Sequence, residues 1–342
     1  MFGHTHYVPI LRWKRAEQKA LRELFPADKH AITPLVEVPG GDHNPRELAE
    51  QIAKTWGHDH MFLDVRHLAT RVPYAGDTHP VTGLFNIARM LGLKVIPVTG
   101  LLCDRTYQAA ISADSITGNL GACIRLFKSD LVRSSLAADL EGLVSALRLQ
   151  AASVDLVVDL QIFGSSRHDL AALCAALPKV TKWRTLTVAS GSFPKDLTGL
   201  TVGQHLLPRL EWQSWKRQLS TVLPRRPTYG DYAMLHPYLS PWFPGMNVSA
   251  SVRYTIDEHW LIMRGEGLLN KKGAGHAQYP ANAELLCHRT EYRGPQFSYG
   301  DKYIYEIALK KERPGNPETW LRAGVNHHLT FVVRQITNMF GL

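Results

Sequence analysis

Eight short runs rich in β-branched and aromatic residues constrain the fold of this chain more than any other feature. They occupy residues 7–12, 33–38, 61–66, 94–99, 122–127, 156–161, 185–190 and 229–234. Segments of helical periodicity separate the runs, for example at residues 15–24, 44–56, 136–149 and 167–177. This alternation predicts repeated β/α units around a parallel sheet.

The count and spacing of the runs favour a closed barrel. Their starts lie roughly 25 to 45 residues apart, close to what each unit of a barrel uses when eight units take about 250 residues. The alternative is an open, doubly wound sheet, but no glycine-rich dinucleotide-binding motif follows the first strand. We therefore predict an α/β protein with a (β/α)₈, TIM-barrel-like fold.

The sequence changes character after residue 236, where prolines and aromatic residues alternate. A β-hairpin is predicted at residues 251–264, turning at Asp257-Glu258, and is followed by a Gly- and Lys-rich loop at 265–276. Two helical stretches follow, at residues 278–288 and 319–340. We predict a barrel over 1–236, an insertion or lid region with the hairpin over 237–317, and a C-terminal helix over 318–342 that packs on the barrel.

Composition narrows the class of protein. With 342 residues, 45% of them hydrophobic and 20% charged, the chain can bury a large core. No run approaches the roughly 18 apolar residues of a membrane span, and the first residues lack the pattern of a secretory signal, so we expect a cytoplasmic protein without a membrane partner. The four cysteines form no C-x-x-C pair, which argues against a zinc knuckle or a disulfide framework. A net charge of +9 favours an anionic partner, although the charge is dispersed.

Polar residues stand at the ends of several predicted strands. Because alternate side chains of a barrel strand point inward, we expect these residues to project toward the axis at the C-terminal mouth of the barrel. The candidate catalytic carboxylates are Glu37, Asp64 and Asp159. The candidate ligand-binding residues of the same mouth are Arg12, Lys14, Arg66, Thr99, Arg125, Gln161, Ser190 and Asp231.

Three interpretations of this group remain open. Buried charges need partners, so the carboxylates can form salt bridges with Arg12, Arg66 and Arg125 in a purely structural cluster. Alternatively, the carboxylates hold Mg²⁺ or Mn²⁺ while Lys14 or Arg66 neutralises a phosphate, an arrangement suited to a phosphodiesterase or nuclease. In the third interpretation, the basic residues recognise a nucleotide or phosphate without any reaction.

A second polar group lies in the last predicted helix. Trp320, Gly324, His327 and His328 share one face of it, so we treat His327 and His328 as further candidate ligand-binding residues. Adjacent histidines of a regular helix cannot both reach one metal ion, and a core or interface role for them is an equal alternative. The chain has 16 histidines but no H-x-H or H-E-x-x-H motif, which argues against zinc hydrolase chemistry.

Motifs at both ends of the chain resemble those of the Beta protein family, which is named after a protein of a satellite coliphage. They are YVPILRWKRAE at 7–17, PLVE at 34–37, FSYGDKYI at 297–304 and TWLRAGVNHH at 319–328. The resemblance covers nearly the whole chain, in the middle by pattern more than by motif. It implies a role in antiphage defence, in modules of the toxin–antitoxin or phage-exclusion type, with a co-encoded defence or toxin protein as partner. It implies no catalytic residues.

The leading hypothesis from the sequence is therefore a component of a defence module that binds an anionic ligand or a partner protein at the barrel mouth. A metal-assisted phosphodiesterase or nuclease is the first alternative. A nucleic-acid-binding protein that uses its basic surface is the second, and it predicts binding that weakens steeply with salt.

Overall fold

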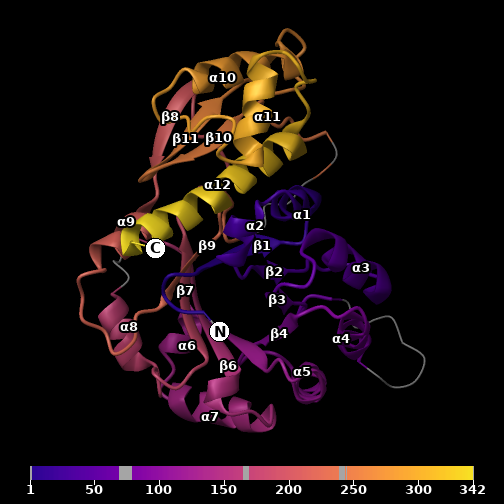
Figure 1. Ribbon diagram of the computed structural model, residues 1–342, viewed down its shortest axis with the longest axis vertical. Coiled ribbons are helices and arrows are strands. Elements are labelled where there is room, and N and C mark those ends of the chain that lie inside the picture. Colours follow the sequence, from indigo (N-terminus) through magenta and orange to yellow (C-terminus); the bar gives the residue numbers. More distant parts are fainter. Residues whose placement is uncertain (1, 69–78, 165–168, 239–242, 244, 342) are drawn as a thin grey trace. The chain divides into compact units, whose positions relative to one another are not determined.

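A closed eight-stranded barrel dominates the computed structural model, which describes residues 2–68, 79–164, 169–238, 243 and 245–341 (Figure 1). The strands follow one another around the ring in chain order, and the last pairs with the first. They are β1 (Tyr7–Arg12), β2 (Leu35–Glu37), β3 (Met61–Asp64), β4 (Val95–Thr99), β5 (Ala122–Phe127), β6 (Val154–Ile162), β7 (Thr185–Gly191) and β9 (Thr228–Asp231). The predicted (β/α)₈ fold is confirmed, and each strand falls within or beside its predicted run.

Helices connect the barrel strands. They are α1 (Arg15–Arg22), α2 (Pro26–His30), α3 (Pro45–Thr55), α4 (Pro80–Met90), α5 (Arg105–Gly118), α6 (Lys128–Leu131), α7 (Leu136–Ala146), α8 (Leu170–Ala176) and α9 (Leu210–Arg217), with a 3₁₀ turn, η1 (Ala151–Ser153), before β6. Helix α3 illustrates how local sequence starts one of them. The Asn44 side chain accepts hydrogen bonds from the backbone N–H of Arg46 and Glu47, and Pro45 occupies the first turn. Its apolar face then buries Leu48 and Ile52.

The chain divides into two compact units that do not follow the three consecutive segments predicted from the sequence. The first unit comprises Met1–Trp13, His30–Ser190 and Ser214–Asp231, and the second comprises Lys14–Lys29, Gly191–Gln213 and Tyr232–Leu342. Helix α1 belongs to the second unit because it packs against the C-terminal helix α12 (Pro317–Phe340). Asn326 Nδ2 donates to the carbonyl of Ala20 at 2.9 Å, and Lys19 Nζ lies 2.8 Å from Glu318 Oε1.

The second unit is built on a three-stranded antiparallel sheet of order β10-β11-β8. The predicted hairpin is present as β10 (Val252–Ile256) and β11 (His259–Arg264), whereas β8 (Gly203–Pro208) was not predicted. The loop after the hairpin returns along residues 248–250, where Ala250 N–H donates to Glu266 C=O at 2.9 Å. A 3₁₀ turn, η2 (Gly275–Ala277), leads into α10 (Gln278–Cys287), and α10, α11 (Tyr299–Ala308) and α12 complete the unit.

Helix α11 corrects one expectation, since no helix was predicted between the helical stretches at residues 278–288 and 319–340. Ser298 caps the helix by accepting a hydrogen bond from Asp301 N–H at 3.1 Å. Gly300 obscured the helical pattern, yet the packing requires glycine there because a Cβ atom would lie 2.1 Å from the carbonyl oxygen of Ala323. Within the described ranges, no helix is long and apolar enough to cross a membrane.

His6, in the turn before β1, is expected to make the stability of the protein depend on pH. Its ring stacks on Phe2 at 4.3 Å, its Nε2 lies 2.9 Å from Thr33 Oγ1, and burial lowers its pKa from 6.5 to about 4. The unfolded chain therefore binds this proton more readily, so the free energy of unfolding should fall by up to about 3 kcal/mol as the pH drops from 6.5 to 4. Urea titrations at several pH values should show a weaker acid dependence in His6→Gln. An unchanged dependence would contradict the assignment to His6.

Candidate functional site

The ends of β1, β2 and β3 place three predicted site residues side by side. Arg12 pairs in register with Glu37, and Glu37 pairs with Asp64. Residues opposite one another on parallel strands point to the same face of a sheet, so these three side chains form a row across the C-terminal ends of the strands. The side chains at the ends of β1, β2 and β3 thus lie close together, as the sequence predicted.

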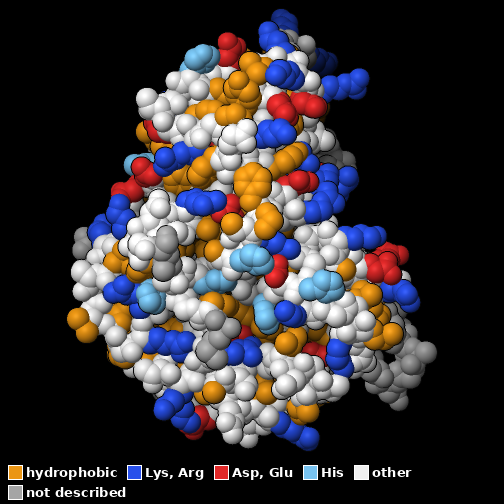
Figure 2. Space-filling model, viewed as in Figure 1, with side chains coloured by type: hydrophobic (Ala, Val, Ile, Leu, Met, Phe, Trp, Pro, Cys, Tyr) orange, Lys and Arg blue, Asp and Glu red, His pale blue; other side chains and the backbone are white. Residues whose placement is uncertain are grey.

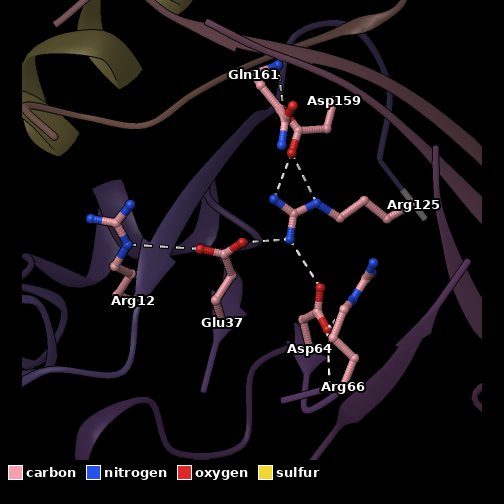
Figure 3. A network of polar contacts seen from close by, with 7 residues as sticks. All are labelled: Arg12, Glu37, Asp64, Arg66, Arg125, Asp159 and Gln161. Carbon is pink, nitrogen blue, oxygen red and sulfur yellow. Dashed lines mark hydrogen bonds and ion pairs between the residues drawn. The ribbon is translucent and has the colours of Figure 1, made fainter. Parts of the chain in front are cut away.

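Arg125, from β5, reaches into the space between three carboxylates (Figure 3). Its Nη1 lies 2.7 Å from Glu37 Oε1 and 2.9 Å from Asp64 Oδ2. Its Nη2 and Nε lie 2.5 and 3.0 Å from Asp159 Oδ2. Around this centre, Arg12 Nε lies 3.9 Å from Glu37 Oε2, and Arg66 Nε donates to Asp64 Oδ1 at 2.8 Å. We call this group the Arg125 cluster: Arg12, Glu37, Asp64, Arg66, Arg125 and Asp159.

The Arg125 cluster is buried and balanced in charge. The side chains of Arg125, Asp64 and Asp159 are 2%, 2% and 0% exposed, and three arginines face three carboxylates. Burial alone raises the pKa of Asp64, but the nearby guanidinium groups of Arg66 and Arg125 outweigh this and hold the pKa below its usual value. In the structure, these carboxylates and arginines form salt bridges with one another, as the structural interpretation of the group expects.

The same geometry bears on metal binding. Glu37, Asp64 and Asp159 turn their oxygens toward the guanidinium group of Arg125, which occupies the place between them. Within the part of the chain that the structure describes, no three His, Cys, Asp or Glu side chains are grouped so as to hold a metal ion. For these carboxylates to coordinate Mg²⁺ or Mn²⁺, Arg125 would first have to move away.

A pocket of about 320 Å³ opens beside the Arg125 cluster. Its size is at the lower end of the range for small-molecule sites. Arg66 and Arg125 both lie against the ring of Phe127, with their Cζ atoms 5.2 and 5.0 Å from its centroid. The lining residues are Arg66, His67, Gly100, Leu101, Leu102, Cys103, Asp104, Tyr107, Arg125, Phe127 and Asp130.

Two lining residues have a buried polar side-chain atom without a hydrogen-bond partner among the described residues, namely Asp130 at Oδ1 and Arg66. Of the two, Arg66 is the hydrogen-bond donor. Its Nε is bound by Asp64, whereas its Nη2 is buried and has no hydrogen-bond partner among the described residues. Burial lowers the pKa of Arg66, but the carboxylate of Asp64 more than compensates, so the pKa is raised and the side chain is a cation. A buried donor without a partner is unfavourable, which makes it a contact point for an acceptor that enters the pocket.

Two carboxylates also line the pocket, and both are engaged with backbone N–H groups. Asp104 caps α5, accepting from Tyr107 N–H at 2.8 Å and from Thr106 Oγ1 at 2.6 Å. These hydrogen bonds, that of Thr106 first, lower the pKa of Asp104. Asp130 Oδ2 accepts from Phe127 N–H at 2.8 Å, whereas its Oδ1 is buried without a hydrogen-bond partner among the described residues. The N-terminus of α5 partly offsets the charge of Asp104, and Arg66 is the lining cation with a donor that an incoming acceptor can use.

Three predicted residues of the barrel lie on the other face of the sheet. Asp231 pairs with Pro9, which alternates with the inward-facing positions of β1 and therefore points outward. Its carboxylate accepts hydrogen bonds from Tyr7 and Tyr229 at 2.5 and 3.1 Å. Gly230 holds the inward position instead, where a Cβ atom would lie 2.9 Å from Ala189 Cβ. The expectation that Asp231 projects toward the axis is therefore wrong, because the strand register differs by one residue.

Thr99 and Ser190 also point away from the barrel axis, as the strand register shows. Thr99 pairs with Ile124, which alternates with Arg125 along β5 and so points away from the Arg125 cluster. Ser190 follows Ala189, the register partner of Gly230, and therefore points to the same side as Asp231. Both side chains are buried, at 0% and 8% exposure, but the structure does not bring them to the cluster.

The remaining predicted residues are placed as follows. Gln161 adjoins Asp159, whose Oδ1 accepts its N–H at 2.8 Å, and it adopts a left-handed backbone with φ of 56° (Figure 3). Lys14 is exposed before α1 and belongs to the second unit. His327 and His328 also belong to the second unit, where both are 0% exposed and contact Thr255. The two histidines are therefore core residues of the second unit, the alternative role named for them above.

Sequence reasoning missed the apolar and aromatic part of the pocket. Phe127 ends β5 two residues after Arg125 and therefore points to the same face, a signal that strand alternation contains. Leu101, Leu102 and Cys103 follow β4 in a β–α loop, the class of segment that forms the mouth of such barrels. Only polar residues were considered as candidates, although ligand pockets are mostly apolar.

Basic side chains do not gather on the face drawn in Figure 2. Lys and Arg are scattered there among hydrophobic and other side chains. Within each unit, the described residues of that face therefore form no continuous basic surface of the kind that tracks a nucleic-acid backbone.

Comparison with known proteins identifies one relationship. A family model described as Beta protein matches residues 7–334, which covers nearly the whole chain and includes segments of both units. The comparison with curated proteins finds no match.

Proposed function

Because the chain belongs to the Beta protein family, we propose that it acts in antiphage defence by binding a small anionic ligand in the pocket beside the Arg125 cluster. The defence role comes from the resemblance described above, and the binding role comes from the pocket. The proposal places the protein in the cytoplasm, where a co-encoded defence or toxin protein would recognise its ligand-bound form.

One observation carries the binding role: the buried Nη2 of Arg66 has no hydrogen-bond partner among the described residues. Asp64 shares its charge between Arg66 and Arg125, so Arg66 is only partly neutralised. An anionic oxygen at Nη2 would gain a charge-assisted hydrogen bond, the stronger class of hydrogen bond in proteins. The fixed position of the guanidinium, held by Asp64 and Phe127, means that little side-chain entropy is lost on binding.

The apolar lining suggests the chemistry of the rest of the ligand. Leu101, Leu102 and Phe127 stand beside Arg66 in a pocket that accommodates a small molecule. A ligand that combines a phosphate or carboxylate with a flat ring matches both parts. A mononucleotide is a common biological molecule with these features.

We expect titration calorimetry to detect one mononucleotide bound per chain, with no binding of the corresponding nucleoside. Arg66→Met should weaken that binding by roughly 10- to 100-fold, the effect of one charge-assisted hydrogen bond. Arg89→Met is the matched control, since Arg89 pairs with Asp114 outside the pocket and its loss should leave binding unchanged.

Several outcomes would overturn the proposal. If AMP, GMP, CMP, UMP and inorganic phosphate all fail to bind, the anionic ligand is refuted. If Arg66→Met binds as tightly as the wild type, the pocket is not the site. The titrations are repeated with Mg²⁺ and Mn²⁺, and nucleotide hydrolysis that requires the metal and disappears in Asp64→Asn would replace the binding role with the phosphodiesterase alternative.

A further inference from the structure

The pocket beside the Arg125 cluster contains a buried acceptor as well as a buried donor. Asp130 lines the pocket at 2% exposure, and its Oδ1 has no hydrogen-bond partner among the described residues. Its Oδ2 accepts from Phe127 N–H, which fixes the side chain at the start of α6. Asp104, the other lining carboxylate, is exposed, so water can satisfy its oxygens. A buried carboxylate oxygen without a donor is unfavourable, so Asp130 indicates that a ligand supplies a donor there.

Arg66 and Asp130 select opposite ends of such a ligand. Arg66 Nη2 and Asp130 Oδ1 do not bond to each other, because neither atom has a partner among the described residues. A phosphate is attracted by Arg66 and repelled by Asp130, so the donor that meets Asp130 belongs to the end of the ligand away from the phosphate. In a mononucleotide, that end is the base.

The four common bases differ in what they offer to a carboxylate. Guanine presents two adjacent donors, the ring N1–H and the 2-amino group, which can pair with the two oxygens of one carboxylate. The amino groups of adenine and cytosine adjoin a ring nitrogen that is an acceptor, and the N3–H of uracil lies between two carbonyl oxygens. An ionised carboxylate only accepts, so it repels an acceptor that lies beside the donor. Asp130 therefore favours guanine.

We propose that the ligand of this pocket is a guanine nucleotide, with its base bound by Asp130 and its phosphate bound by Arg66. The inference rests on the proposed function, because it specifies the base of the mononucleotide bound there. Leu101 and Leu102 supply apolar surface for the ring within the same pocket. A site whose buried polar group needs a particular ligand donor discriminates strongly against ligands that lack it.

Titration calorimetry of the wild type tests the choice of base without any substitution. GMP should bind at least about tenfold more tightly than AMP, CMP or UMP. Inosine monophosphate carries the N1–H but lacks the 2-amino group, so it should bind roughly tenfold more weakly than GMP.

Asp130→Asn tests which residue reads the base. The asparagine side chain retains an oxygen for Phe127 N–H but places an amide donor opposite the donors of guanine. GMP should therefore bind roughly 10- to 100-fold more weakly. Xanthosine monophosphate has a carbonyl oxygen in place of the 2-amino group, so it should bind more tightly to this variant than to the wild type.

Asp169→Asn is the matched control. Asp169 is an exposed cap of α8 outside the pocket, where it accepts from Ala171 N–H at 2.8 Å. The same substitution there removes the same charge from a helix start, and it should leave the affinities for GMP and xanthosine monophosphate unchanged.

The outcomes separate this inference from the proposed function. If all the nucleotides bind with similar affinity and Arg66→Met weakens each of them, the proposed function stands and the guanine nucleotide is refuted. A preference for GMP that Asp130→Asn leaves intact, or that Asp169→Asn abolishes equally, refutes Asp130 as the residue that reads the base. If no nucleotide binds, the proposed function and this inference both fail.

Discussion

Replacing Arg125 with methionine is expected to lower the free energy of unfolding by about 3–5 kcal/mol at neutral pH. The substitution retains most of the side-chain volume but removes the cation that binds Glu37, Asp64 and Asp159. Two of those carboxylates are almost completely buried, and an unpaired buried charge costs far more than a surface one. Urea titration followed by circular dichroism measures the change.

Acid should reduce the effect of Arg125→Met, because carboxylates that have lost their partner take up protons. The control is Arg133→Met, since Arg133 forms an exposed pair with Asp139, at 2.8 Å and with 40% and 28% exposure. Its loss should change the stability by less than about 1 kcal/mol. Equal losses in the two variants, or an Arg125→Met loss that does not depend on pH, would mean that the cluster is not a buried ionic network.

The second large effect is expected in the other unit, where Asp301→Ala should lower the free energy of unfolding by about 4 kcal/mol. Asp301 is 0% exposed and accepts from Tyr254 OH at 2.7 Å and from Ser298 Oγ at 2.6 Å. It also lies 2.8 Å from His327 Nδ1, and the other nitrogen of that ring faces the carbonyl of Thr255. Alanine would leave three buried polar groups without their partner.

Asp257→Ala provides the comparison for this second variant. Asp257 is 79% exposed and lies 3.5 Å from Arg293, so its removal should cost well under about 1 kcal/mol. Thermal unfolding of both variants gives the result directly. A melting temperature for Asp301→Ala close to that of the wild type would show that the buried polar group contributes little to stability.

These two networks explain why polar motifs in this sequence were ambiguous. Asp64 and His327 were both candidate functional residues because polar side chains at strand ends or on one helix face are typical of sites. In the structure, each is bound to other buried polar groups of its own unit. A polar residue at such a position shows that a partner is required, but the identity of that partner depends on what lies beside it in space.

Local sequence determined the secondary structure of the barrel and the class of fold, whereas β8 and α11 of the second unit were not predicted. Apolar runs of β-branched residues produce buried strands, helical periodicity produces the covering helices, and their repeated alternation closes a barrel. Alternation along one strand also places Phe127 with Arg125. Strand alternation and helical periodicity act within single elements of the chain, which is why they can be recognised without coordinates.

Only the tertiary structure shows toward which face of the sheet Asp231 points and to which unit α1 belongs. It also shows that Arg125 lies between the three carboxylates. Register between strands differs by single residues, and one step moves a side chain to the opposite face. Helix α1 is bound to α12 by contacts between residues such as Asn326 and Ala20, far apart in the chain. Strand pairing and helix packing determine these features. A local sequence pattern does not indicate which distant segment a strand, helix or side chain will contact.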